Sequence, residues 1–150
     1  NYLKAYIEIQ EVRFNNNIVI YYEVDDSLLE HSVFRLMLQP IIENSVNHGI
    51  RSTNARCCIK IKVRRKMNYI CVDIVDNGCG MTKAVLKELK NKINDAKSKN
   101  IGLTNLNRRL ILQYGEDSRL KILSKKDMGT VVSFRIPIRE TGKENIIYTE

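Results

Sequence analysis

The sequence contains no tryptophan, and aromatic residues make up only 7% of its 150 residues. A surface that stacks on nucleic-acid bases is therefore disfavoured. No apolar run approaches the roughly 18 residues that a membrane-spanning helix needs. With only two histidines, His31 and His48, the sequence offers little to a Ser-His-Asp triad. It also lacks a P-loop motif and a spaced set of zinc ligands. The chain begins at Asn1 without an initiator Met or a signal-peptide pattern, so we expect it to be part of a longer protein.

The cysteines argue against a scaffold held by disulfides or zinc. Cys57, Cys58, Cys71 and Cys79 form no CxxC pair, and we expect structural free thiols in a reducing cytosol. With 43% hydrophobic and 28% charged residues, the composition is that of one globular domain. The net charge of +8 favours an anionic partner: a nucleotide, a nucleic acid or a membrane surface.

Hydrophobic periodicity predicts the order helix, strand, helix, hairpin, helix, helix, hairpin. The helices are expected at 2–13, at 28–48 with Pro40 inside it, after an N-cap at Thr82, and from Leu103 to a stop at Gly115. The strands are expected around 18–22 and at 55–66, 69–76, 119–124 and 130–136. This order predicts an α+β fold, a two-layer sandwich with helices on one face of a mixed sheet.

The segment Asp76-Asn77-Gly78-Cys79-Gly80-Met81 directly follows a predicted strand. Alternation places Asp76 on the same face as Ile70, Val72 and Ile74, so its carboxylate faces the core and needs a partner. The two glycines let the backbone approach a ligand closely, and the carboxylate can accept a hydrogen bond from an adenine amino group. The alternative is an ordinary Asp-Asn-Gly turn.

The segment 39–49 places Asn44 at the edge of an apolar helix stripe, on the same side as Asn47 and His48. A neutral amide oxygen in that position can bind Mg²⁺ beside a triphosphate. The alternatives are a solvated amide for Asn44 and, for His48, a favourable place at the negative end of the helix dipole.

The third segment, 100–109, joins a polar loop to a helix that starts near Gly102. A helix N-terminus offers free N–H groups to a phosphate, and Lys92, Lys97 and Lys99 of the preceding stretch suit the same ligand. The alternative is an ordinary loop-to-helix junction. Thr130 is in phase with Val132, so its hydroxyl is predicted to face the same interior as Asp76.

In order along the chain, these segments resemble the ATP-binding domain shared by DNA gyrase, the heat-shock chaperone ATPase, histidine kinases and MutL. Within that group, the chain is similar to the catalytic domain of LytS/YehU-type sensor histidine kinases over residues 2–138. The matching stretches are YLKAYIEIQEVRF, LQPIIENSVNHGI, DNGCGM, IGLTNLNRRLILQYG and GTVVSFRIP.

The resemblance implies a Bergerat-type sandwich that binds ATP and Mg²⁺ between the sheet and the helices. Asn44 would ligate Mg²⁺, Asp76 would bind the adenine amino group with the support of Thr130, and Gly102 and Leu103 would hold phosphate. The other residues it places against the nucleotide are Asn47, His48, Gly78, Gly80, Met81, Asn100, Ile101 and Arg109.

Two departures from the group's pattern affect the expected chemistry. Asn100 stands where many relatives have glycine, which predicts a stiffer or less closed lid over the phosphates. Pro40 occupies the usual position of the general-base carboxylate, four residues before Asn44. Glu43 is the remaining acidic candidate for a catalytic role, but it faces about 100° away from Asn44 on a helix. We therefore expect poor ATP hydrolysis, which a kinase has to suppress in any case.

The resemblance also implies what surrounds the domain in its parent protein. Residues 1–15 would lead in from a missing dimerisation and phospho-acceptor bundle, 16–138 would form the catalytic domain, and 139–150 a polar tail. The parent would be a membrane-anchored protein whose catalytic domain is cytoplasmic. It would transfer the γ-phosphoryl group of ATP to an upstream histidine, for relay to a response regulator. Neither His31 nor His48 has the setting of that histidine.

Two rival interpretations remain open from the sequence alone. One lies within the same superfamily: the chain is either a degenerate domain that acts as an interaction module without nucleotide, or a different ATPase. The other is a nucleic-acid binder that uses the basic run Lys60, Lys62, Arg64, Arg65 and Lys66. We expect no nucleic-acid partner, because a solvated sheet face explains this run better when only Tyr69 could stack.

Overall fold

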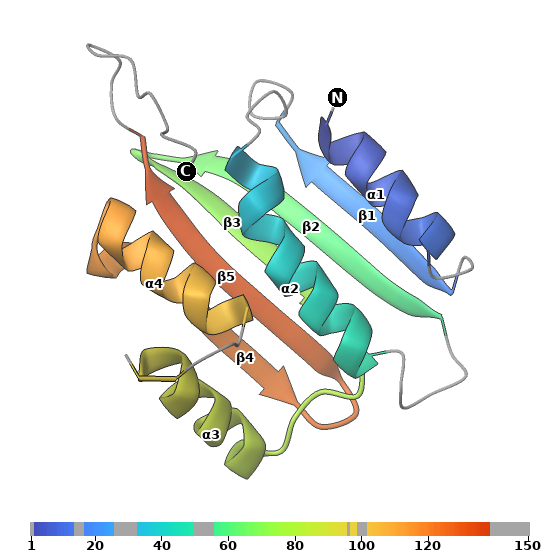
Figure 1. Ribbon diagram of the computed structural model, residues 1–150. Helices are drawn as coiled ribbons and strands as arrows, with labels where there is room; N and C mark the ends of the chain where they lie inside the picture. The colour runs from blue at the N-terminus through green and yellow to red at the C-terminus, as the bar shows by residue number, and fades with distance from the viewer. Residues whose placement is uncertain are drawn as a thin grey trace.

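A computed structural model describes residues 2–13, 17–25, 33–49, 56–95, 97–98 and 102–138, and it confirms the predicted order of elements (Figure 1). The helices are α1 (Tyr2–Arg13), α2 (Val33–Gly49), α3 (Lys83–Asn94) and α4 (Gly102–Tyr114), followed by a 3₁₀ turn η3 (Glu116–Ser118). The strands are β1 (Ile18–Val24), β2 (Cys57–Lys66), β3 (Tyr69–Asp76), β4 (Lys121–Lys125) and β5 (Gly129–Pro137). The start of the predicted 28–48 helix, most of the lysine-containing loop before Gly102 and the tail 139–150 lie outside the described residues.

The five strands form one mixed sheet in the order β1-β2-β3-β5-β4. β1 and β2 are parallel because α2 crosses over between them, and the other pairs are antiparallel. A two-residue turn at Met67 and Asn68 closes the β2–β3 hairpin, as the sequence predicted. β5 pairs with both β3 and β4, and this places Thr130 directly opposite Asp76.

The helices cover one face of this sheet, so the core lies between two layers (Figure 1). Each strand alternates buried and less buried residues, as expected for a sheet with one packed face. The sheet contributes mainly branched side chains, and α2 and α4 contribute mainly leucines and isoleucines. The most completely buried of these are Ile18, Leu38, Ile41, Ile42, Ile59, Ile61, Val63, Val72, Ile74, Leu103, Leu106 and Leu110.

The helix α1 packs on the same layer at the edge of the sheet. Ile7 is buried in the core, and the Glu11 carboxylate accepts a hydrogen bond from the backbone N–H of Ile20 on β1 at 3.2 Å. The helix therefore covers part of an edge strand that would otherwise expose its backbone groups. That α1 also leads in from an upstream bundle stays a prediction.

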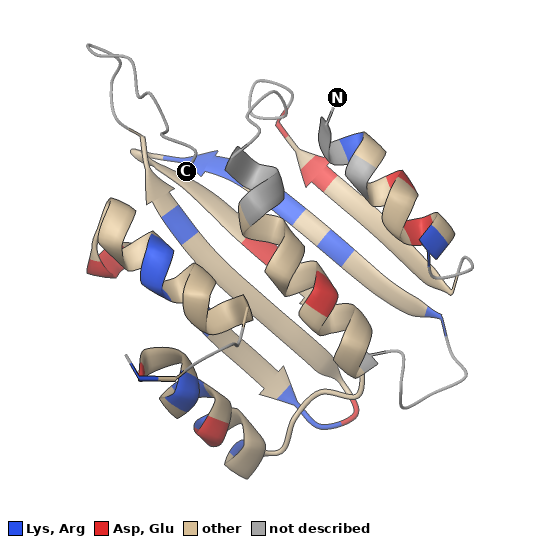
Figure 2. Cartoon of the chain, viewed as in Figure 1, with Lys and Arg blue, Asp and Glu red and all other residues tan. Residues whose placement is uncertain are grey.

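Charged residues of β2 alternate with its core-facing residues and so lie toward the other face of the sheet; Figure 2 marks their positions along the strand in blue. Two members of the basic run on β2 are paired with acids on neighbouring strands: Lys60 with Glu23 at 2.5 Å and Arg64 with Asp73 at 2.7 Å. The pKa of Glu23 is lowered, first by its hydrogen bond to Lys60. This pairing agrees with the interpretation of the basic run as a solvated sheet face.

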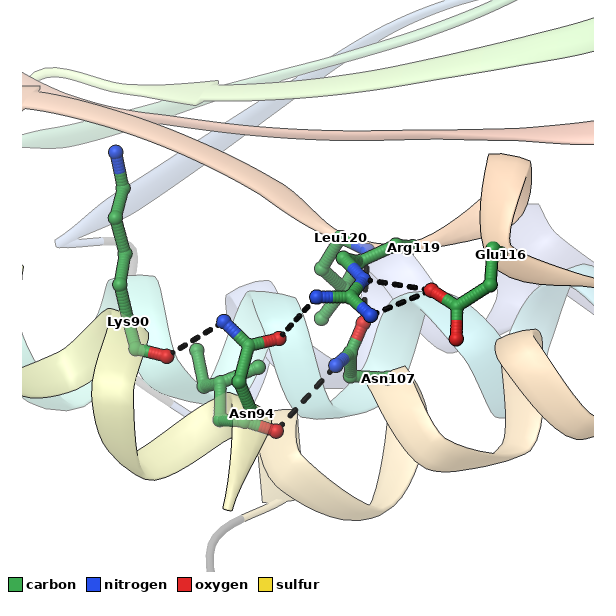
Figure 3. A network of polar contacts seen from close by, with 7 residues as sticks. Lys90, Asn94, Asn107, Glu116, Arg119 and Leu120 are labelled. Atoms are coloured by element: carbon green, nitrogen blue, oxygen red, sulfur yellow. Dashed lines mark hydrogen bonds and ion pairs between the residues drawn. The ribbon is translucent and has the colours of Figure 1, made fainter. Parts of the chain in front are cut away.

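A polar network joins α3, α4 and the segment between α4 and β4 (Figure 3). The buried Asn107 side chain donates to the carbonyl of Ile93 at 3.3 Å and accepts from the backbone N–H of Leu120 at 2.9 Å. Arg119 donates to the Asn94 side chain at 3.1 Å and pairs with Glu116. Because these residues are engaged with the helices, β4 starts at Lys121, two residues later than the sequence predicted.

The packing of α4 predicts a sharp difference between two of its leucines. Leu110 is fully buried, whereas Leu112 is 80% exposed. Leu110→Ala should lower the free energy of unfolding by about 2–5 kcal/mol, because it removes core contacts and leaves a cavity. Leu112→Ala should change it by less than about 0.5 kcal/mol. Urea denaturation of both variants measures this, and equal effects would contradict the assigned face of α4.

Candidate functional site

A cavity of about 420 Å³ opens between α2, α3, the turn after β3 and the start of β5. Its volume lies within the range usual for small-ligand sites. Its lining residues come from three distant parts of the sequence: α2, the stretch 76–92 with the glycine turn and α3, and the start of β5. They are Asn44, Ser45, His48, Asp76, Gly78, Cys79, Gly80, Met81, Val85, Glu88, Leu89, Lys92 and Thr130.

The Asp76 carboxylate is the polar centre of this cavity. It ends β3 on the core-facing side, as alternation predicted, and is only 8% exposed. Its Oδ1 accepts hydrogen bonds from the backbone N–H groups of Gly78 at 2.9 Å and Thr130 at 3.2 Å. Its Oδ2 accepts from the hydroxyl of Ser45 on α2 at 2.8 Å. These three donors compensate the burial of the carboxylate and fix its orientation.

The turn after Asp76 packs closely against the β4–β5 hairpin. The backbone N–H of Asp127 donates to the carbonyl of Cys79 at 2.7 Å. Gly80 has a φ of +61°, and a Cβ there would lie 1.9 Å from the carbonyl oxygen of Lys125. Only glycine fits this position, because both the backbone conformation and the free space exclude a side chain.

The helix α3 supplies the outer wall of the cavity. Thr82 caps it by accepting a hydrogen bond from the backbone N–H of Val85 at 3.3 Å, which confirms the predicted N-cap. The residues that face the cavity recur at helical spacing: Val85, Glu88, Leu89 and Lys92. Lys92 pairs with Glu88 at 2.6 Å, and its hydrogen bond lowers the pKa of the Glu88 carboxyl.

The helix α2 contributes Asn44, Ser45 and His48, whose directions fall within about 100° of one another on a helix. Asn47 is exposed and does not line the cavity, since it points to the far flank of Asn44. Glu43 points further away, and its carboxylate accepts a hydrogen bond from Gln39 at 3.0 Å. The thiol of Cys79 donates to the carbonyl of His48 at 3.2 Å, which ties the end of α2 to the glycine turn.

All four cysteines are free thiols, as the sequence predicted. Burial raises the pKa of the Cys57 thiol to about 11, and the negative charge of Asp76 adds to this effect. The neutral thiol is therefore the form of Cys57 near neutral pH, which suits a structural role.

The structure thus brings seven of the sequence-predicted site residues to one cavity: Asn44, His48, Asp76, Gly78, Gly80, Met81 and Thr130. Gly102, Leu103 and Arg109 lie on α4 but do not line the cavity, and Asn100 and Ile101 lie outside the described residues. Ser45 was missed, although a signal existed: it is the one polar residue among the buried positions 41, 42, 45 and 46 of α2. On α3, Lys92 had been singled out as suited to phosphate, but the wall formed with Val85, Glu88 and Leu89 was missed because these residues fit an ordinary amphipathic stripe.

Comparison with known proteins identifies the family. Residues 32–140 match the family model described as "Histidine kinase-, DNA gyrase B-, and HSP90-like ATPase". The match covers more than half of the chain, which therefore belongs to this family.

Individual relatives and solved structures agree with this assignment. The sensor protein kinase HptS of Staphylococcus aureus strains bovine RF122 / ET3-1 and USA300 is 31% identical over 140 residues, which cover 92% of this chain and 27% of that protein. The chain thus spans about a quarter of the length of these curated relatives. The catalytic domain of the histidine kinase ThkA has a TM-score of 0.62 at 21% identity and covers 90% of this chain and 88% of that one. The histidine kinase domain of the Erythrobacter litoralis EL346 blue-light activated kinase has a TM-score of 0.61 at 16% identity, with 89% and 60% covered. The two structures show that the fold is shared.

In the described part of the chain, no helix is long and apolar enough to cross a membrane.

The contact between the glycine turn and the hairpin generates a prediction with a matched control. Gly80 and Gly115 both have positive φ, but a Cβ at Gly115 would meet nothing within 4 Å. Gly115→Ala should cost about 1–3 kcal/mol of stability from backbone strain alone. Gly80→Ala should cost about 1–3 kcal/mol more, because the Lys125 carbonyl must also move. Denaturant midpoints of the two variants test this, and a smaller loss for Gly80→Ala would refute the close approach.

Proposed function

We propose that this chain is the ATP-binding catalytic domain of a sensor histidine kinase. The observation that carries the proposal is the buried Asp76 carboxylate, oriented by three hydrogen-bond donors at the wall of a cavity bounded by a glycine turn. Membership of the ATPase family and the likeness to histidine kinase catalytic domains support it. The finer resemblance to LytS/YehU-type kinases stays part of the proposal.

The adenine ring would occupy the cavity between the glycine turn and α3. Asp76 would accept a hydrogen bond from the exocyclic amino group, and Thr130 stands beside it on β5. Met81, Val85 and Leu89 supply apolar contacts for the faces of the ring. This combination of apolar walls and a few oriented polar groups is what a nucleobase requires.

The phosphates would extend from the cavity toward the N-terminus of α4. A Cβ on Gly102 would lie 3.2 Å from the Cβ of Pro40, so α4 begins against α2 one helical turn before Asn44. The free N–H groups of this first turn and its dipole favour phosphate oxygens. Lys92, at the edge of the cavity, offers a positive charge to the same groups.

Asn44 is half-buried at the cavity wall, and its side-chain oxygen fits a magnesium ligand. Bound Mg²⁺ would neutralise phosphate charge during phosphoryl transfer. Glu43 is turned toward Gln39, which supports weak activation of water and hence poor ATP hydrolysis. The protein would then act by positioning and by electrostatics.

In the parent protein, the γ-phosphoryl group would pass to a histidine on an upstream dimerisation domain and from there to the aspartate of a response regulator. The partners of this domain would be ATP and ADP, that upstream domain and, through the parent, the regulator. We place the domain in the cytoplasm, in a parent anchored to the membrane.

The adenine assignment is tested with Asp76→Asn. The variant replaces an oriented acceptor with an amide, so the affinity for MgADP should fall about ten- to a hundredfold while the domain stays folded. Titration calorimetry measures the affinity, and circular dichroism checks the fold. The matched control is Asp73→Asn, the same change on the same strand but on the open face, where the side chain pairs with Arg64.

An unchanged MgADP affinity in folded Asp76→Asn would remove the basis of the proposal. Absence of nucleotide binding in the unmodified chain would favour a degenerate interaction module instead. In the full-length protein, Asp76→Asn should also abolish transfer of labelled γ-phosphate to histidine, which separates a kinase from a binding module.

The metal assignment is tested with Asn44→Ala. Because the amide is assigned to Mg²⁺ and not to the base, ATP affinity should fall about tenfold in the presence of Mg²⁺ and change little in EDTA. Asn91→Ala on α3, an exposed asparagine that does not line the cavity, serves as the control. Equal losses with and without Mg²⁺ would refute the assignment.

A further inference from the structure

Ser124 of β4 lies directly behind the cavity, although it does not line it. It is the register partner of Thr130 on β5, which does line the cavity. The Ser124 Oγ lies 2.9 Å from the carbonyl oxygen of Gly129 and 2.9 Å from the Oγ1 of Thr130. Nothing in the residue pattern singles it out, because a serine in a short strand is ordinary.

The protons of these two hydroxyls can be assigned. A serine hydroxyl has one proton, and a carbonyl oxygen can only accept, so the Ser124 proton is donated to Gly129. The contact between the two hydroxyls then requires Thr130 to donate its own proton to the Ser124 oxygen. Thr130 is left with lone pairs alone, and toward the cavity it can only accept a hydrogen bond.

The same reasoning applies to the other oxygens at this end of the cavity. The Ser45 proton is donated to Asp76 Oδ2, and both carboxylate oxygens of Asp76 are acceptors. Ser45, Asp76 and Thr130 therefore form a wall of hydrogen-bond acceptors. A ligand group with two N–H donors can donate to these acceptors. A ligand carbonyl oxygen cannot, because its lone pairs would face the lone pairs of the wall.

We propose that Ser124 is a specificity-determining residue that fixes Thr130 as an acceptor, so that the cavity selects a 6-aminopurine nucleotide over a 6-oxopurine nucleotide. This inference rests on the proposed adenine site and deepens it. Ser124 acts only through Thr130 and does not touch the nucleotide. Asp76 supplies one acceptor for the amino group, and Ser124 ensures that Thr130 supplies a second.

The test compares MgADP with MgIDP, whose bases carry an amino group and a carbonyl oxygen at position 6. The unmodified chain should prefer MgADP. In Ser124→Ala, the Thr130 hydroxyl is free to rotate and donate its proton to the carbonyl oxygen of the hypoxanthine base. The affinity for MgIDP should then rise and the preference for MgADP should shrink by about tenfold, the value of one hydrogen bond.

Three further variants sharpen the result. Ser124→Thr keeps the hydroxyl and should keep the preference. Ser124→Cys introduces a side chain close in size to serine, but its thiol is too weak an acceptor to hold the Thr130 proton. This variant should therefore behave like Ser124→Ala, and it replaces Ser124→Ala if that variant fails to fold. Ser133→Ala makes the same change on the outer face of β5 and should have no effect.

Three results would overturn the inference, and they differ in what they imply for the proposed function. Suppose that the unmodified chain binds MgADP, and that Ser124→Ala and Ser124→Cys either keep its full preference for MgADP or lose affinity for both nucleotides equally. Ser124 then has only a structural role, and the inference is wrong while the proposed function stands. If the unmodified chain binds MgADP and MgIDP equally, the acceptor wall is refuted. If it binds neither nucleotide, the proposed function itself fails and the inference fails with it.

Discussion

The rest of the site depends on one buried carboxylate. Asp76 closes β3 inside a mainly apolar layer, where an uncompensated charge would be costly. The donors that compensate it come from Ser45 of α2, Gly78 of the following turn and Thr130 of β5. A single side chain therefore joins the helix layer, a loop and two strands at the place where the cavity opens.

This arrangement links stability to the capacity to bind a ligand. Backbone N–H groups occupy Oδ1, so the fold uses one side of the carboxylate. Among the described residues, Oδ2 accepts only from the Ser45 hydroxyl and keeps a lone pair for a ligand. A hydrogen bond from the Asp127 N–H to the Cys79 carbonyl holds the glycine turn against the β4–β5 hairpin, and Gly80 permits the close approach to the Lys125 carbonyl. The cavity is thus held by contacts that the fold itself requires, which is how a site remains oriented without its ligand.

Much of the fold and part of the site were predictable from periodicity. Alternation along β3 and β5 was enough to put Asp76 and Thr130 on the core-facing side, and the helix cap at Thr82 followed from residue type. The sheet order could not be derived in this way, because nothing local shows that β5 inserts between β3 and β4. The burial of Ser45 had a signal in its apolar neighbours, but its hydrogen bond to Asp76 and the wall formed by α3 depend on how the helices pack on the sheet. Asn47 shows the converse: helical spacing placed it beside Asn44, but a shift of about 60° turns it away from the cavity.

Under the proposed function, the same assembly would let one helix serve both ends of a nucleotide. Along α2, Ser45 donates to Asp76, Asn44 lines the cavity, and Pro40 one turn earlier lies against the start of α4. In the proposed nucleotide complex, acceptors would therefore gather at one end of the ligand and the N–H donors of α4, a helix that does not itself line the cavity, at the other. This polarity is complementary to a molecule with an amino group at one end and phosphates at the other. Because α2 is continuous between these points, the distance between the two ends is set by helix geometry, at about 1.5 Å per residue, and is not free to drift with the surrounding loops.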